Sequence, residues 1–157
     1  MMQKMERQML KLEGFDLLKY LNATGGKGWD VIWRDSRLLR FSKINPKHII
    51  LDEFLSGERG FDVLNSYKNR LRAGNNTPLG AEAFQALLEN EDVIPEDWKS
   101  PLGDEKILYI AFPGDEFKAP SGKSCILVLF HYLGRWTWDI VASEELTEDD
   151  HLMIACI

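Results

Sequence analysis

The stretch SCILVLFHY, residues 124–132, carries the clearest structural signal in this chain of 157 residues. Residues 126, 128, 130 and 132 are apolar or aromatic, and they alternate with a second, largely apolar set at 125, 127, 129 and 131. An extended segment with two apolar faces belongs in the middle of a sheet that is covered on both sides. We therefore predict a central strand over residues 124–132.

The residues around this stretch extend the sheet. Leu133 and Gly134 permit a tight turn into RWTWDIV, residues 135–141, which predicts a neighbouring strand. A strand is also expected over 106–112, where Pro113-Gly114-Asp115 should end it, and a short last strand over 152–157. Together these segments predict an antiparallel meander of three or four strands.

Helical periodicity dominates the earlier part of the chain. Apolar residues at a spacing near 3.6 predict helices over 5–12, 15–21, 61–71 and 78–88, and one further turn over 94–99. The helix over 78–88 has the clearest start, because Thr77 can cap it and Pro78 suits the first helical position. Helices followed by strands predict an α+β fold, with helices in the N-terminal and middle parts packed on the meander sheet.

The N-terminal third also contains a period of two. Trp29, Val31 and Trp33 share one face of an extended segment, and Asp35-Ser36 can turn the chain into a partner strand over 37–41. This pattern predicts an additional N-terminal hairpin. A short strand is expected over 48–51.

Composition describes a globular chain, with 45% hydrophobic and 28% charged residues, of a length typical of one domain over 1–157. The net charge of −6 divides unevenly, as residues 1–74 carry +5 and residues 75–157 carry −11. No apolar run is long enough to span a bilayer, and no export signal precedes the first predicted helix. Cys125 and Cys156 lie in apolar runs and are expected to be reduced core residues in a cytoplasmic protein.

Residues 79–88 (LGAEAFQALL), 94–99 (IPEDWK) and 134–138 (GRWTW) form a recognisable series. On these residues, the C-terminal half resembles a group of short bacterial proteins to which no activity is attached. The chain departs from that group in its last residues, where LMIAC replaces an ending that contains Asn-Pro-Ala. The resemblance supports the boundaries of the expected elements and implies no mechanism.

Motifs for chemistry are weak. Ser121-Gly122-Lys123-Ser124 resembles the end of a phosphate-binding loop, but Phe117 stands where the first glycine is needed and a strand follows instead of a helix. His48, His131 and His151 lie too far apart for metal-ligand spacing, and Cys125 is roughly 20 Å along a strand from His131. We predict no catalytic, cofactor-binding or metal-binding residues and no cofactor, which favours a protein that is not an enzyme without deciding the question.

The remaining hypothesis is a non-catalytic module of a bacterium or mobile element that binds another protein. Its predicted partner surface is the strand that follows the turn, at Arg135, Trp136, Trp138 and Asp139, because Trp and Arg concentrate binding energy at interfaces. One alternative is an acidic inhibitor or nucleic-acid mimic, with its charge on residues 89–97 and 144–150. Another is an enzyme or small-ligand binder whose site joins residues distant in sequence. A membrane partner is not expected, and the net negative charge of the chain disfavours binding of nucleic acid through the basic residues 34–47.

Overall fold

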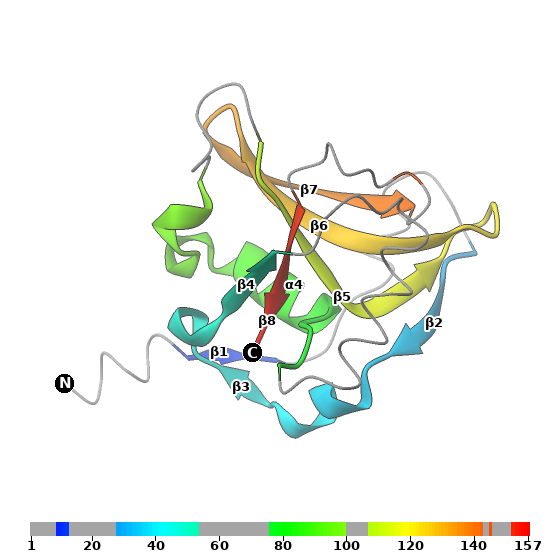
Figure 1. Cartoon of the computed structure of the whole chain (residues 1–157), viewed down its shortest axis with the longest axis horizontal. Helices are drawn as coiled ribbons and strands as arrows, with labels where there is room; N and C mark the ends of the chain where they lie inside the picture. Colours follow the sequence, from blue (N-terminus) through cyan, green and yellow to red (C-terminus); the bar gives the residue numbers. More distant parts are fainter. Residues whose placement is uncertain (1–8, 13–27, 54–75, 100–106, 143–144, 146–151) are drawn as a thin grey trace.

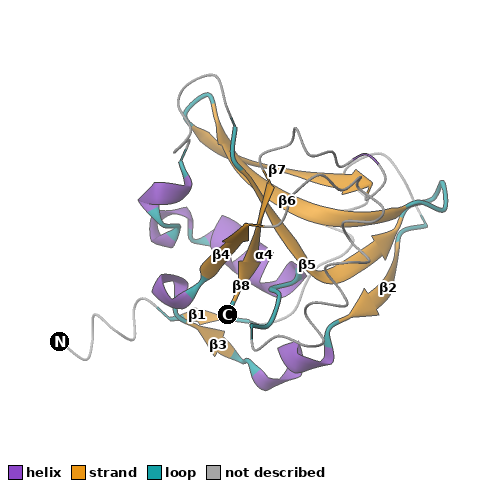
Figure 2. Ribbon diagram, viewed as in Figure 1, coloured by secondary structure: helices purple, strands orange, loops and turns teal. Residues whose placement is uncertain are grey.

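The computed structural model describes residues 9–12, 28–53, 76–99, 107–142, 145 and 152–157. Within these residues the chain forms one α-helix and eight strands in two sheets, with 47% of residues in strands and 25% in helices (Figures 1 and 2). The predicted fold, helices packed on a small meander, is therefore wrong. The protein is mostly sheet, and short 3-10 turns occupy several of its connections.

The larger sheet is built around β6 (Ser124–Tyr132), as the sequence predicts. It pairs antiparallel with β5 (Tyr109–Lys118) on one side and with β7 (Arg135–Ala142) on the other. The last strand, β8 (Leu152–Cys156), was expected beside this meander. It lies instead on the far side of β5, parallel to it and antiparallel to β4 (Ile50–Glu53).

Strand β5 continues through Pro113 and Gly114, where the sequence predicted a break. The break is replaced by a change of partner, since the register with β6 shifts between Phe112 and Phe117. The amide of Gly114 donates to the carbonyl of Leu79 at 2.9 Å, and its carbonyl accepts from the amide of Asp35 at 2.8 Å. Proline has no amide to donate to a ladder, so an irregularity here costs the sheet little.

Strand β2 (Asp30–Arg34) confirms the predicted strand over residues 29–34, but not its hairpin. It pairs antiparallel with the second half of β5. The expected partner strand over 37–41 is instead a 3-10 turn, η2 (Ser36–Arg40). The side chain of Asp35 accepts the amide of Arg37 at 3.0 Å, which favours a helical turn over an extended chain.

A second, two-stranded sheet joins β1 (Leu10–Lys11) to β3 (Lys43–Ile44). The predicted helix over 5–12 is therefore wrong in its described residues 9–12. Leu10 and Ile44 are paired and both buried, so packing between two distant segments overrides the local helical period. The predicted helices over 15–21 and 61–71 lie outside the described residues.

Helix α4 (Ala81–Glu89) confirms the helix expected from residue 78, but it begins three residues later. Thr77 exchanges two 2.8 Å backbone hydrogen bonds with Ile157, so it extends the edge of the sheet and does not cap the helix. Two 3-10 turns follow α4, namely η4 (Glu91–Val93) and η5 (Glu96–Trp98), and the second confirms the predicted turn over 94–99.

One face of the larger sheet packs on α4. The ring of Phe84 stands edge-on to Phe112 of β5 at 5.7 Å and to Trp138 of β7 at 5.9 Å. A separate apolar cluster that includes Ile126 and Val128 forms the other face. The central strand is thus buried on both faces, as its sequence predicts. Cys125 and Cys156 are buried in this sheet and are not joined by a disulfide.

Candidate functional site

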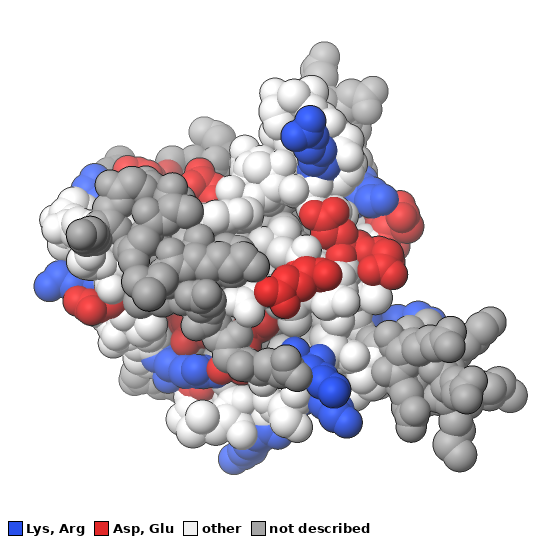
Figure 3. Space-filling model, turned by 180° about the vertical axis from the view of Figure 1, so that it is seen from behind, with Lys and Arg blue, Asp and Glu red and all other residues white. Residues whose placement is uncertain are grey.

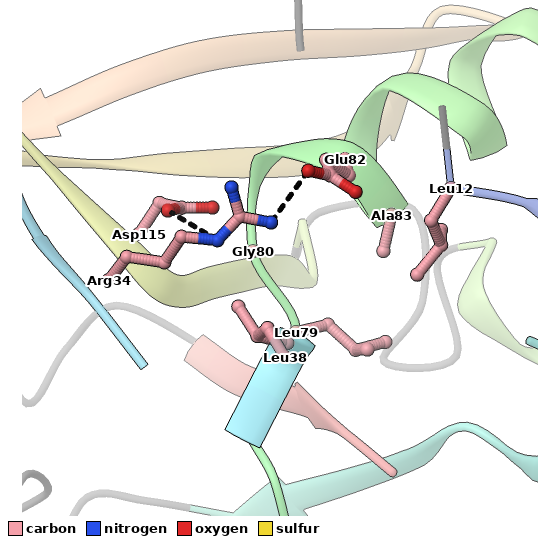
Figure 4. A pocket seen from close by; sticks show the side chains of 8 residues that line it. All are labelled: Leu12, Arg34, Leu38, Leu79, Gly80, Glu82, Ala83 and Asp115. Atoms are coloured by element: carbon pink, nitrogen blue, oxygen red, sulfur yellow. Dashed lines mark hydrogen bonds and ion pairs between the residues drawn. The ribbon is translucent and has the colours of Figure 1, made fainter. Parts of the chain in front are cut away.

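Three charged side chains from distant segments meet where α4 begins. Arg34 ends β2, Asp115 lies in the second half of β5, and Glu82 is in the first turn of α4 (Figure 4). Arg34 Nη2 donates to Glu82 Oε1 at 2.6 Å, and Arg34 Nε lies 3.8 Å from Asp115 Oδ1. We call Arg34, Glu82 and Asp115 the charged junction.

Asp115 caps α4 from outside the helix. Its Oδ2 accepts the amide of Ala81 at 2.8 Å, which supplies the acceptor that Gly80, at the N-cap, has no side chain to provide. Asp115 is only 3% exposed. Burial raises the pKa of Asp115, and the Ala81 amide and the charge of Arg34 offset only part of that rise. Burial alone would lower the pKa of Arg34, but the hydrogen bond to Glu82 and the charges of Asp115 and Glu82 outweigh it and raise that pKa.

Two glycines, Gly80 and Gly114, allow β5 to lie close to the segment that leads into α4. A Cβ on Gly114 would lie 2.6 Å from the carbonyl oxygen of Pro78 and 2.9 Å from the amide nitrogen of Gly80. A Cβ on Gly80 would overlap the carboxylate of Asp115. Glycine is therefore required at both positions for β5 to lie against the segment that leads into α4.

A second ion pair lies beside the junction. Arg37 donates from Nε to Asp35 Oδ1 at 3.0 Å and from Nη2 to Asp35 Oδ2 at 2.7 Å, a bidentate arrangement. Arg37 also donates to the carbonyl of Asn76 at 3.3 Å, which ties η2 to the chain before α4. Burial alone would raise the pKa of Asp35, but the hydrogen bonds and charge of Arg37 outweigh it and lower that pKa.

The junction forms one wall of a shallow depression with about 220 Å³ of empty space, part of it open solvent. Ligand sites usually enclose about 300–1,000 Å³. Both oxygens of Asp115 are engaged, one by the Ala81 amide and one by Arg34, and the guanidinium of Arg34 points at Glu82 (Figure 4). Paired carboxylates can serve in acid–base chemistry, but these hold the start of a helix in place. We assign the junction a structural role.

A different kind of feature occurs at the turn between β6 and β7. Tyr132 and Arg135 form the last pair of the hairpin, so Leu133 and Gly134 are its two loop residues. Both have positive φ, 49° at Leu133 and 77° at Gly134, as the type I′ turn requires. Glycine, Asn and Asp adopt this backbone readily, whereas a bulky side chain is strained there. Leu133 is nevertheless 82% exposed.

The neighbours of Leu133 complete a small surface that we call the hairpin tip: Tyr132, Leu133, Gly134 and Arg135. Directly opposed residues of an antiparallel pair share a face, so the exposed side chains of Tyr132 and Arg135 lie together. The tip occupies one end of the curved sheet, opposite the turn between β5 and β6 (Figure 1).

The predicted partner surface is divided by the strand. Trp138 is half-buried against Phe84, and Trp136 stands edge-on to His131 at 5.1 Å, so both rings lie on the face that packs toward α4. Arg135 and Asp139 are exposed and alternate with these rings. Of the four residues, Arg135 contributes to the hairpin tip.

The other sequence candidates are scattered. Ser121-Gly122-Lys123 forms the turn between β5 and β6, where the amide of Ala119 donates to the carbonyl of Lys123 at 2.9 Å. His48 is exposed in η3 (Pro46–His48), while His151 lies outside the described residues. Within the parts of the chain that the structure describes, no group of three His, Cys, Asp or Glu side chains could hold a metal ion.

All the acidic residues of the segment 89–97 are exposed. Figure 3 shows acidic side chains grouped on one part of the rear face. The second acidic segment, 144–150, falls outside the described residues except for Glu145. That residue lies 3.7 Å from Lys123 as an exposed ion pair.

No family model, curated protein or solved structure matches the chain. In the described residues, no helix has the length and apolar character needed to cross a bilayer.

Asp115 and Leu133, the central residues of the two regions, were not predicted from sequence. The sequence predicts that Pro113-Gly114-Asp115 ends a strand, whereas Asp115 is a buried carboxylate within one. Burial of a carboxylate depends on the folded structure and leaves no local sequence pattern. Leu133 was read as an ordinary turn residue. The sequence does contain a signal for Leu133. In a two-residue turn whose second residue is glycine, the first residue is usually Asn, Asp or Gly, and here it is leucine.

Proposed function

We propose that this protein is a non-catalytic module that binds another protein through the hairpin tip. The observation that carries the proposal is Leu133, a bulky residue with a φ of 49° and an 82% exposed side chain. Strained backbone is concentrated at functional sites. A leucine that is both strained and solvent-exposed gains nothing from its own fold, so a contact outside the fold is its best explanation.

The chemistry of the tip defines the partner. Leu133 fits an apolar pocket, and the half-exposed Tyr132 can cover the pocket's border with its ring while its hydroxyl remains hydrated. Arg135 has no ion pair within the described residues. It therefore fits an acidic group on the partner at the edge of that pocket.

The test is affinity capture with three versions of the protein: wild type, Leu133→Asn and Leu39→Asn. Leu39 is the matched control, because it is 79% exposed but lies in η2 and away from the tip. We expect one stoichiometric protein to be retained by wild type and by Leu39→Asn. Burying one leucine contributes about 1.5–3 kcal/mol, so Leu133→Asn should weaken binding of the purified partner at least about tenfold.

Equal capture by Leu133→Asn, or protection from hydrogen exchange on a surface other than the tip, would contradict the proposal. The acidic-inhibitor alternative has a different requirement, namely that segments 89–97 and 144–150 lie side by side. Substitutions in segment 89–97 would then abolish capture, and Leu133→Asn would not.

A further inference from the structure

We infer that a second surface, separate from the hairpin tip, binds the phosphate backbone of a nucleic acid. Four cations form this surface, which we call the basic ribbon: Lys11, Arg40, Lys43 and Lys47. They come from β1, the end of η2, β3 and η3. The structure thereby divides the basic segment 34–47 into residues that serve the fold and residues that face solvent.

Ion pairs distinguish the cations that serve the fold from those that face solvent. Arg34 and Arg37 contact Glu82 and Asp35, at 2.6 and 2.7 Å. The four ribbon cations have no ion pair with any described carboxylate, although all four are exposed. The chain from 36 to 51 contains no Asp or Glu at all. None of the three ribbon cations in this segment, Arg40, Lys43 and Lys47, therefore has an acidic neighbour within it.

The centre of the ribbon is a pair of like charges. Lys11 and Lys43 are direct partners in the β1–β3 ladder, and their neighbours Leu10 and Ile44 are buried beneath the sheet. Both lysines therefore point outward on one face, a few ångströms apart at Cβ, where like charges destabilise the pair. Closely spaced anions would relieve that repulsion, and a phosphodiester chain provides them at regular intervals.

Local structure holds the flanking cations in place. Asn45 accepts the amide of Lys47 at 3.0 Å and Pro46 is buried, which fixes η3 with Lys47 outward. Leu38 is buried under η2 and leaves Arg40 exposed. On the rear face, basic side chains lie along the lower border, where Figure 1 places β3 and η2 (Figure 3).

The test measures binding of a labelled 20-base-pair duplex as a function of salt, with DNA and RNA as parallel arms. Each phosphate contact contributes about −0.9 to the slope of log affinity against log salt, so four contacts predict a loss of about 150-fold between 50 and 200 mM salt. The double variant Lys11→Gln/Lys43→Gln should lose only about 12-fold over the same range. Lys118→Gln is the control, since Lys118 is an exposed lysine opposite Asp30 on the β2–β5 ladder.

A steeper response from one duplex identifies which nucleic acid the ribbon prefers. Absence of binding at 50 mM salt would overturn the inference, and so would an unchanged salt slope in the double variant or an equal change in Lys118→Gln. Tighter binding to phosphatidylserine vesicles than to either duplex would assign the ribbon to a membrane surface and would overturn the inference as well. Leu133→Asn should bind the duplex as wild type does, so the two proposals fail independently.

Discussion

The charged junction and the hairpin tip both hold residues in arrangements that are unfavourable in isolation. At the junction, the carboxylate of Asp115 is almost fully buried, and the backbone at Gly114 lies against the backbone of Pro78 and Gly80. At the tip, a leucine has positive φ and is surrounded by solvent. The junction compensates internally, since Asp115 caps a helix and contacts a guanidinium. No described residue compensates Leu133 in this way.

This difference separates architecture from function. Where an unfavourable group is matched by partners in the same chain, its removal should damage the fold. Where it has no such partners, its removal should leave the fold intact or improve it. The predictions below test that distinction, beginning with the largest expected effect.

Gly114→Ala should destabilise the protein most, by about 3 kcal/mol or more, because its Cβ would meet backbone atoms of Pro78 and Gly80 that cannot move independently. Urea unfolding measures the loss. Gly122→Ala is a useful control, because Gly122 has open space around it and any cost there reflects its φ of 90° alone. Equal losses in the two variants would mean that close packing at Gly114 is unimportant.

Asp115→Ala should lower the free energy of unfolding by about 2 kcal/mol, because the amide of Ala81 loses its acceptor inside the fold. Glu82→Ala should cost less, since its ion pair with the partly exposed Arg34 is accessible to water. Chemical denaturation of both variants checks the order. A larger loss from Glu82→Ala would show that the ion pair, and not the cap, organises the junction.

The two buried aspartates should respond to pH in opposite directions. Asp35 has a lowered pKa, so its stabilising contribution is present above the unfolded pKa of about 3.9 and is lost as the pH falls through the folded pKa. Asp115 has a raised pKa, so the contribution of its protonated form is complete below about 3.9 and is lost as the pH rises through the folded pKa.

Unfolding of Asp35→Asn and Asp115→Asn at pH 3, 5 and 7 tests these signs against wild type. The advantage of wild type over Asp35→Asn should be greatest at pH 7, whereas its advantage over Asp115→Asn should grow as the pH falls from 7 toward 4. Parallel curves for the two variants would contradict the environments assigned to these carboxylates.

Sequence patterns predicted the elements that depend on neighbours in the chain. The strand over 124–132, the turn at Leu133-Gly134 and the strand beginning at Arg135 follow from local alternation and are confirmed. The predicted helix from 78 is also present, with a later start. The pairings failed where they join distant segments, as β8 inserts between β4 and β5, and β2 pairs with β5.

The site was less predictable for the same reason. Arg34, Glu82 and Asp115 are separated by dozens of residues, and only the crossing of β2, β5 and α4 brings them together. The local pattern also predicted a helix over residues 9–12, where the structure has a strand because Leu10 is buried against Ile44. Arg135 was selected from sequence, whereas the significance of Leu133 emerges from its φ and exposure.

The most direct test of the account is the free energy of unfolding of Leu133→Asn, measured beside wild type in urea. Asparagine tolerates positive φ, so the substitution should relieve strain and raise stability by about 1 kcal/mol, while removing the side chain that we propose a partner binds. A decrease in stability of similar size would show that Leu133 works within the fold, and it would contradict the assignment of the hairpin tip as a binding surface.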